Sequence, residues 1–183
     1  MIAVPNRFSP EEYLLLDRDN PVRHEYRQGL VYAMAGGTSN HSRISVNFLS
    51  LVNPQLDDTP CRLYNGDMKV SHADEFFYYP DAFVTCDPRD REDRYIKRHP
   101  KLVVEVLSQS TQDFDRDKKF LDYQKIDSLE EYILISQETQ QVECRRRTTD
   151  NTWETEIYAV GDRVTLTSLD LEFDLERLYR NLD

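Results

Sequence analysis

Glu105 is the residue whose surroundings most strongly suggest chemistry. It lies inside residues 102–107 (LVVEVL), the most apolar predicted strand of the sequence, and such a run is typical of a strand covered on both faces. A carboxylate buried there without a partner destabilises the fold by several kcal/mol. We therefore expect Glu105 to contact a metal ion or a cationic side chain, or else to point off an edge and pair with a lysine.

Asp81 is the second acidic candidate. It follows Pro80 within a predicted strand, and proline in a strand is confined to an edge, a start or a bulge, where a side chain can point outward. Pro-Asp is also common in simple turns, which is the alternative interpretation. If the two strands are neighbours, the carboxylates of Asp81 and Glu105 meet, and such hard oxygen ligands suit Mg²⁺ or Mn²⁺.

Several elements must position these acids. Ser9-Pro10-Glu11-Glu12 predicts the start of a helix that ends at Asn20-Pro21. A strand over 26–34 with a turn at Gln28-Gly29 follows, and then a long helix from a cap at 38–40 to about Leu56. The next predicted strands are 61–71, with a turn at Asn65-Gly66-Asp67 as an option, 76–86 and 101–107.

The second half of the chain is richer in strands. A helix is predicted over 111–126, with a capping box at 110–113. Strands follow at 131–135, 142–146 and 153–158, and a short closing helix at 175–182. The order predicts one α/β (α+β) domain over residues 1–183, with a mixed sheet flanked by helices and a β-rich C-terminal extension.

Composition limits the location and the redox chemistry. No apolar stretch is long enough to cross a bilayer, and we read no signal peptide at the N-terminus, so we expect a cytoplasmic protein without membrane partners. The three cysteines, Cys61, Cys86 and Cys144, form no CxxC pair. We expect buried reduced thiols and neither a disulfide framework nor a zinc site.

The formal net charge of −11 argues against tight binding to nucleic acid. A metal site must itself concentrate carboxylates, however, and a bound metal reverses the local sign of the charge. The cations also cluster, at 89–101 and at 145–147. The acidity therefore weakens a nucleic-acid role without removing it.

Pro80-Asp81 followed by Glu105-Val106-Leu107 resembles the PD-(D/E)XK signature of restriction-endonuclease-like enzymes. More closely, the chain resembles the Uma-two family of endonucleases in that superfamily. The similar stretches run from about Phe8 to Tyr132 and are His24–Gly29, Met34–Thr38 with His41, Tyr79–Asp81, Pro100–Ser108, Ser110-Thr111, Asp115-Arg116 with Lys119 and Tyr123, and Glu131-Tyr132.

The resemblance implies a restriction-endonuclease-like fold and a metal held by Asp81, Glu105, Val106 and Glu25. It departs from the superfamily motif at Leu107, where a lysine is usual. The resemblance suggests that the lysine has moved to Lys119 on the following helix, with Lys118 as the rival. Asp115, Lys119 and Tyr123 share one helical stripe, which is also the pattern of an ordinary exposed ion pair.

The expected activity is that of a Mg²⁺- or Mn²⁺-dependent endodeoxyribonuclease acting as a homodimer on DNA, with Asp81, Glu105, Lys119 and Glu25 as catalytic residues. His41, Asp115 and Tyr123 are expected to support them. The alternative is an inactive binding or regulatory module of the same fold, which the displaced lysine and the acidity favour. A phosphate-binding loop and a serine-nucleophile motif are absent from the sequence.

Overall fold

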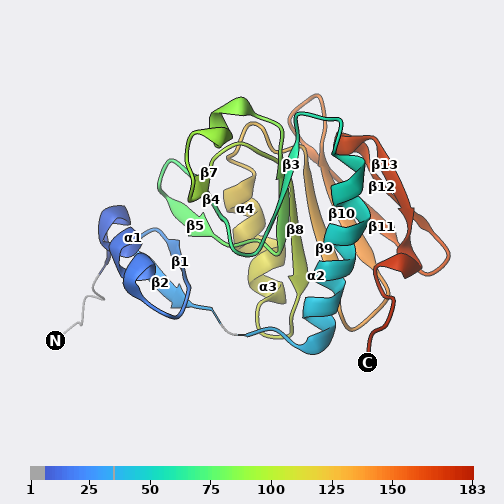
Figure 1. The fold of residues 1–183 in the computed structure, drawn as a ribbon, viewed down its shortest axis with the longest axis horizontal. Coiled ribbons are helices and arrows are strands. Elements are labelled where there is room, and N and C mark those ends of the chain that lie inside the picture. The colour runs from blue at the N-terminus through green and yellow to red at the C-terminus, as the bar shows by residue number, and fades with distance from the viewer. Residues whose placement is uncertain (1–6, 35) are drawn as a thin grey trace.

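A computed structural model describes residues 7–34 and 36–183 (Figure 1). Residues 1–6, on which the expected lack of a signal peptide depends, and Ala35, in the second similar stretch, lie outside the described residues. The central sheet has the strand order β11-β10-β9-β8-β6-β3 and is mixed, because β8 and β9 are parallel. Its strands are β3 (Arg62–Asn65), β6 (Ala82–Thr85), β8 (Pro100–Leu107), β9 (Glu131–Ser136), β10 (Val142–Arg147) and β11 (Trp153–Tyr158).

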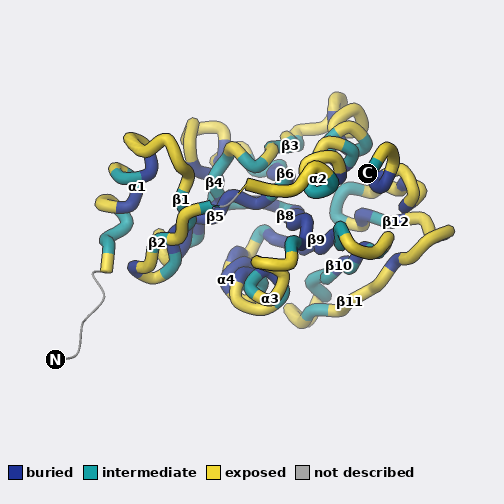
Figure 2. The backbone as a smooth tube through the Cα atoms, turned by 90° about the horizontal axis from the view of Figure 1, so that it is seen from below, coloured by how far each residue is buried: buried dark blue, intermediate teal, exposed yellow. Residues whose placement is uncertain are grey.

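Helices cover both faces of this sheet (Figure 2). On one face, α2 (Ser39–Val52) packs against Val104 and Val106 of β8. On the other, the segment α3 (Gln112–Phe114), η3 (Asp115–Lys119) and α4 (Phe120–Tyr123) covers Val103 and Leu107. Successive side chains of β8 therefore point to opposite faces, and both faces are covered as expected, which explains why the strand is apolar throughout. No helix in the described part of the chain is long and apolar enough to cross a membrane.

A second sheet carries the N-terminal part of the chain. Its order is β2-β1-β5-β4-β7, and α1 (Pro10–Asp19) packs on it through Tyr13, beside Tyr26 and Phe77. The predicted capping box of α1 is confirmed, because Ser9 and Glu12 exchange hydrogen bonds. The strands are β1 (His24–Arg27), β2 (Leu30–Ala33), β4 (Lys69–His72), β5 (Phe76–Tyr78) and β7 (Ile96–Lys97).

The predicted strand 76–86 is wrong as a continuous element, whereas the turn offered at Asn65-Gly66-Asp67 within 61–71 is present between β3 and β4. The predicted strand 76–86 is split into β5 and β6, and the predicted strand 61–71 into β3 and β4; in each case the two halves belong to different sheets. Pro80 explains the first break, because proline has no N–H to donate to a sheet. The chain therefore crosses between the two sheets at Tyr79–Asp81.

The helix after β8 also differs from its prediction. Thr111 is the N-cap and its side chain accepts no capping hydrogen bond, so the predicted capping box at 110–113 is wrong. Ser108 instead accepts the Thr111 N–H. The five residues of η3 form a π-helical turn, a feature that is frequent at functional sites.

The C-terminal extension is β-rich, as predicted. A hairpin of β12 (Arg163–Leu166) and β13 (Leu171–Asp174) joins the core on the α2 face. The predicted closing helix is only a 3₁₀ turn, η5 (Leu175–Arg177). The other 3₁₀ turns are η1 (Asn53–Gln55), η2 (Pro88–Arg91) and η4 (Thr167–Leu169).

The expectation of reduced thiols is wrong for two of the three cysteines. Cys61 and Cys86 form a disulfide, whereas Cys144 is free and buried. Arg62 pairs with Thr85 across β3 and β6, so the next residues outward, Cys61 and Cys86, face each other. Their distance in the sequence concealed this pairing, which only the strand register creates.

We expect the denatured, unreduced protein to show one reactive thiol in an Ellman titration and three after reduction, because only Cys144 is free. The disulfide closes a segment of 25 residues, so reduction should lower the free energy of unfolding by about 3 kcal/mol. Cys61→Ser should show two thiols without reductant. Three thiols in the unreduced wild type would contradict the pairing.

The buried side chain of Asp17 connects α1 to the second sheet through hydrogen bonds and an ion pair. Its carboxylate accepts hydrogen bonds from the Tyr79 hydroxyl at 2.6 Å and the His24 N–H at 2.7 Å, and it lies 2.8 Å from the Lys69 ammonium. Burial by itself would raise the pKa of Asp17, but these donors together lower it. The ionised form is therefore the one that stabilises the fold.

Asp17→Asn should lower the free energy of unfolding by about 2 kcal/mol at neutral pH, because charged hydrogen bonds are lost. Since the folded pKa is lowered, the difference from wild type should be full above about pH 4 and shrink as the pH falls further. The control is Asp19→Asn, whose side chain is 72% exposed. Equal urea midpoints for the two variants would refute this role.

Candidate active site

The ammonium of Lys119 lies among three carboxylates. Its Nζ is 3.0 Å from Glu25 Oε1, 3.1 Å from Glu105 Oε1 and 3.4 Å from Asp115 Oδ1. Lys119 itself is 5% exposed, so this is a buried cluster and not the exposed helical ion pair that the sequence also allowed. Burial by itself would lower the pKa of Lys119, but the carboxylates raise it well above its usual value.

Glu105 lies on the α3–α4 face of β8 and is 4% exposed. Burial raises the pKa of this carboxyl well above its usual value, and the charge of Lys119 opposes that rise. The Tyr123 hydroxyl donates to Glu105 Oε1 at 3.4 Å. The carboxylate in the apolar strand therefore has the cationic partner that its burial requires.

Glu25 reaches the cluster from β1 in the second sheet. Its Oε1 also accepts the Tyr79 N–H at 3.0 Å, at the point where the chain crosses between sheets. The Glu25 side chain is 13% exposed. One carboxylate oxygen thus connects the N-terminal sheet, the Tyr79–Asp81 crossing and Lys119.

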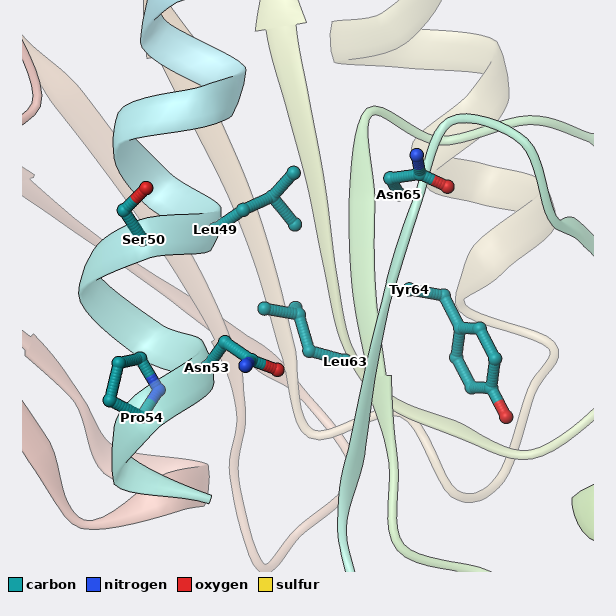
Figure 3. Close-up of a pocket in the computed structure, with 7 residues that line it drawn as sticks. All are labelled: Leu49, Ser50, Asn53, Pro54, Leu63, Tyr64 and Asn65. Carbon is teal, nitrogen blue, oxygen red and sulfur yellow. The ribbon is translucent and has the colours of Figure 1, made fainter. Parts of the chain in front are cut away.

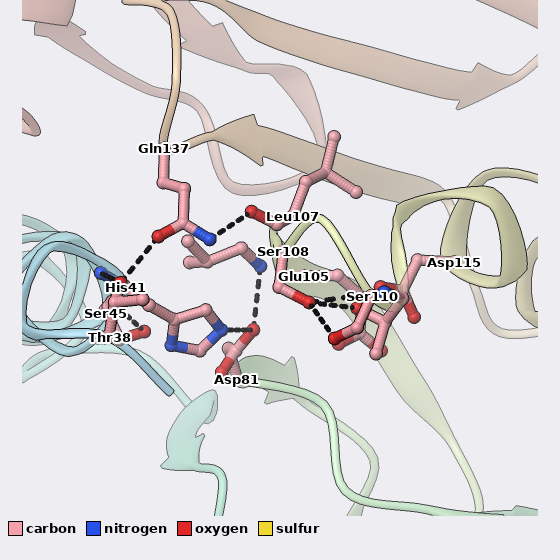
Figure 4. Close-up of polar contacts among 12 residues, drawn as sticks. Thr38, His41, Ser45, Asp81, Glu105, Leu107, Ser108, Ser110, Asp115 and Gln137 are labelled. Carbon is pink, nitrogen blue, oxygen red and sulfur yellow. Dashed lines mark hydrogen bonds and ion pairs between the residues drawn. The ribbon is translucent and has the colours of Figure 1, made fainter. Parts of the chain in front are cut away.

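Asp81 lies immediately before β6, and β6 pairs with β8 in the register Ala82 to Val104. Its Oδ2 accepts the Val106 N–H at 2.7 Å and lies 3.3 Å from His41 Nε2 (Figure 4). Hydrogen bonding to Asp81 raises the pKa of His41. The Asp81 side chain is 22% exposed, so this end of the site is the one open to solvent.

The structure brings together most of the predicted residues. Asp81 and Glu105 come from neighbouring strands as expected, Lys119 and Asp115 come from the π-helical turn, and Val106 joins the site through its backbone N–H. Lys118, the rival to Lys119, is exposed. Leu107 belongs to the apolar core, so its side chain cannot take the place of the usual lysine.

The carboxylates of the site are the kind of ligand that a hard cation prefers, but their side chains are not arranged around a metal position. Within residues 7–34 and 36–183, no three acidic, histidine or cysteine side chains form a ready metal-binding group. The chemistry fits nevertheless, because four carboxylates (Glu25, Asp81, Glu105 and Asp115) outnumber the single lysine. Carboxylate oxygens in excess of local positive charge are what Mg²⁺ and Mn²⁺ require.

Neither predicted cationic cluster lies at the carboxylates. The residues at 145–147 are used within the fold: Arg146 pairs with Glu131, and Arg147 donates to the Leu129 carbonyl. The stretch at 89–101 follows Thr85, at the opposite end of β6 from Asp81. The cationic side chains that contact the candidate residues are Lys119 and His41, among the residues that the structure describes.

Sequence reasoning missed Gln137, which connects the site to α2. Its Nε2 donates to the Leu107 carbonyl at 2.8 Å, and its Oε1 accepts from the Thr38 hydroxyl at 2.6 Å (Figure 4). Thr38 is the N-cap of α2. A glutamine just after a strand carries no chemical pattern in the sequence, so only the packing reveals this bridge.

A groove of about 620 Å³ lies away from these residues, between α2 and the edge strand β3 (Figure 3). Its lining is Leu49, Ser50, Asn53, Pro54, Leu63, Tyr64 and Asn65. None of the candidate residues contributes to it. The candidate site is therefore a buried polar cluster with one open end and not this groove.

The sequence and the fold match known proteins. The model of the Uma2 family, described as "Putative restriction endonuclease", matches residues 10–178, which confirms the expected resemblance. Two uncharacterized proteins of Synechocystis are similar. One, slr1290, is 40% identical over 96% of this chain and 93% of its own length, and the other, sll1609, is 30% identical over 84% and 88%.

A solved structure has the same fold. It is that of "a putative nuclease belonging to DUF820" from Anabaena variabilis, with a TM-score of 0.79, 19% sequence identity, and coverage of 94% of this chain and 97% of that one. The predicted fold class is confirmed by this likeness.

Lys119→Met should lower the free energy of unfolding by about 3–5 kcal/mol, because it leaves buried carboxylates without their counter-ion. Lys118→Met is the matched control, because Lys118 is the adjacent residue and its side chain is exposed. This substitution should change the free energy of unfolding by less than about 0.5 kcal/mol. Urea denaturation measures both. Similar losses for both variants would show that the carboxylates do not depend on Lys119.

Proposed function

The chain belongs to the Uma2 family, and from this membership and the site we propose that it is a metal-dependent endonuclease that hydrolyses the phosphodiester bonds of DNA. The observation that carries the proposal is the ion pair of Glu105 with Lys119 on β8 and the π-helical turn, with Asp81 directly before β6, the strand that pairs with β8. Burying several charged side chains together is costly, so their presence here points to a function at this place.

In this proposal Asp81, Glu105, Glu25 and the backbone carbonyl oxygen of Val106 hold Mg²⁺ or Mn²⁺. Such an ion, when bound, lowers the pKa of a water molecule and stabilises negative charge on the phosphate. Glu105 and Glu25 each present one oxygen to Lys119, so each has a second oxygen for a ligand. Asp81 likewise presents only Oδ2 to the protein.

Lys119 takes the role of the lysine that the superfamily motif places at position 107. Its ammonium, fixed by Glu25 and Asp115, would orient the attacking water or neutralise the charge that develops on the phosphate. The proposed products carry a 5′-phosphate and a 3′-hydroxyl. Two copies would be needed to cut both strands at one place, and a C₂ homodimer is the commonest such assembly.

The proposed site of action is the cytoplasm, where cellular DNA is available. In a reducing cytoplasm the Cys61–Cys86 disulfide of this structure would be open to reduction. These cysteines lie at the opposite end of β6 from Asp81, so the acidic cluster does not depend directly on the disulfide.

One observation favours a second candidate, an inactive binding or regulatory module. The arginines at 145–147 are used in structural contacts, which leaves fewer cations for phosphates. In that case Lys119 and its carboxylates would be a purely structural ion-pair cluster. Metal binding separates the two candidates, because a structural cluster has no need of a divalent ion.

With Mg²⁺ or Mn²⁺, the wild type should cleave plasmid DNA, and Asp81→Ala and Glu105→Gln should each reduce the rate at least about 100-fold, because a ligand of the ion is lost. Calorimetry should show Mn²⁺ binding that both substitutions weaken. Glu130→Gln is the control, since Glu130 is next to a strand but 52% exposed, and should match the wild type. Equal cleavage by all four proteins would indicate a contaminant and overturn the proposal.

A further inference from the structure

The imidazole of His41 is held between Gly37 and Asp81. His41 lies in the first turn of α2, where its N–H donates to the Thr38 hydroxyl at 3.1 Å. On one side of the ring, Nε2 is 3.3 Å from Asp81 Oδ2. On the other side, a Cβ added to Gly37 would lie 2.9 Å from His41 Nδ1, closer than real Cβ contacts.

A glycine is therefore needed at position 37 because a side chain there would collide with the His41 ring, and not because of its backbone conformation. The ring fits against the glycine only because there is no side chain at this position, and an alanine would push the imidazole away. Gly36, the preceding residue, has open space where its Cβ would be. An added side chain would therefore touch His41 at Gly37 and nothing at Gly36.

The contact with His41 restricts the Asp81 carboxylate. Its Oδ2 has two partners, the Val106 N–H at 2.7 Å and His41 Nε2 at 3.3 Å. In the described residues no hydrogen bond or ion pair reaches Asp81 Oδ1. Since the two groups approach the same oxygen from β8 and from α2, together they hold the plane of the carboxylate in one orientation.

We propose that His41 is a positioning residue that fixes the Asp81 carboxylate so that Oδ1 is presented to a divalent cation, and that Gly37 keeps the imidazole in place. This inference rests on the proposed function, because it gives Asp81 the role of a ligand. Groups that orient metal ligands in this way typically change metal affinity 10–100-fold when they are lost.

The test is Mn²⁺ binding by calorimetry, with the metal alone and without DNA. His41→Ala and Gly37→Ala should each weaken Mn²⁺ binding by about 10–100-fold. Gly36→Ala should bind as the wild type does. His41→Gln, whose amide N–H extends to about the position of Nε2, should recover much of the affinity that His41→Ala loses, which a merely structural role would not predict.

Circular dichroism and thermal melting should be used to check that each variant is folded, and Gly37→Ala provides a test that leaves His41 intact. If the wild type binds Mn²⁺ and Asp81→Ala does not, but His41→Ala and Gly37→Ala match Gly36→Ala, the positioning role is overturned while the nuclease proposal stands. If the wild type binds no Mn²⁺, both are overturned.

Discussion

The structure depends on the charge balance around Lys119. Three carboxylates from three different elements, β1, β8 and the π-helical turn, can be buried together because one ammonium lies within 3.4 Å of each. Without that cation each acid would retain its full desolvation cost. The same arrangement keeps more negative than positive charge at one place, which is the condition for attracting a divalent ion.

The crossing of the chain from one sheet to the other at Tyr79–Asp81 determines where two of the acids lie. Because Pro80 has no N–H to donate to a continuous strand ladder, the chain leaves one sheet after β5 and enters the other at β6. The Tyr79 N–H then binds Glu25, and the next acid, Asp81, receives the Val106 N–H. A single irregularity therefore connects the N-terminal sheet to the central one and places two of the acids.

The acidity of the chain is consistent with this organisation. Its arginines at 145–147 neutralise buried carboxylates or bind backbone carbonyls, so they stabilise the β-rich C-terminal part of the fold. Glu131, for example, is 1% exposed and accepts hydrogen bonds from Arg146 and from the backbone of η4. Basic clusters in a sequence are thus poor indicators of a phosphate-binding surface when buried acids are also present.

The sequence by itself determined several of the local elements and singled out Asp81 and Glu105. Ser9 and Glu12 cap α1 through contacts within one turn, and the short apolar run around Glu105 forms the predicted strand. Pro80 correctly predicted an irregularity in the strand, because the lack of a proline N–H is a property of that residue alone. Such features depend on neighbours in the chain, which is why composition and spacing were sufficient.

Only the tertiary structure decided which distant residues meet. The split of residues 61–71 between two sheets, the pairing of Cys61 with Cys86 and the choice of Lys119 over Lys118 all follow from strand register and helix packing. The contact of His41 with Asp81 is of the same kind. These contacts join segments whose separation along the chain carries no information about their distance in space, so no local pattern can specify them.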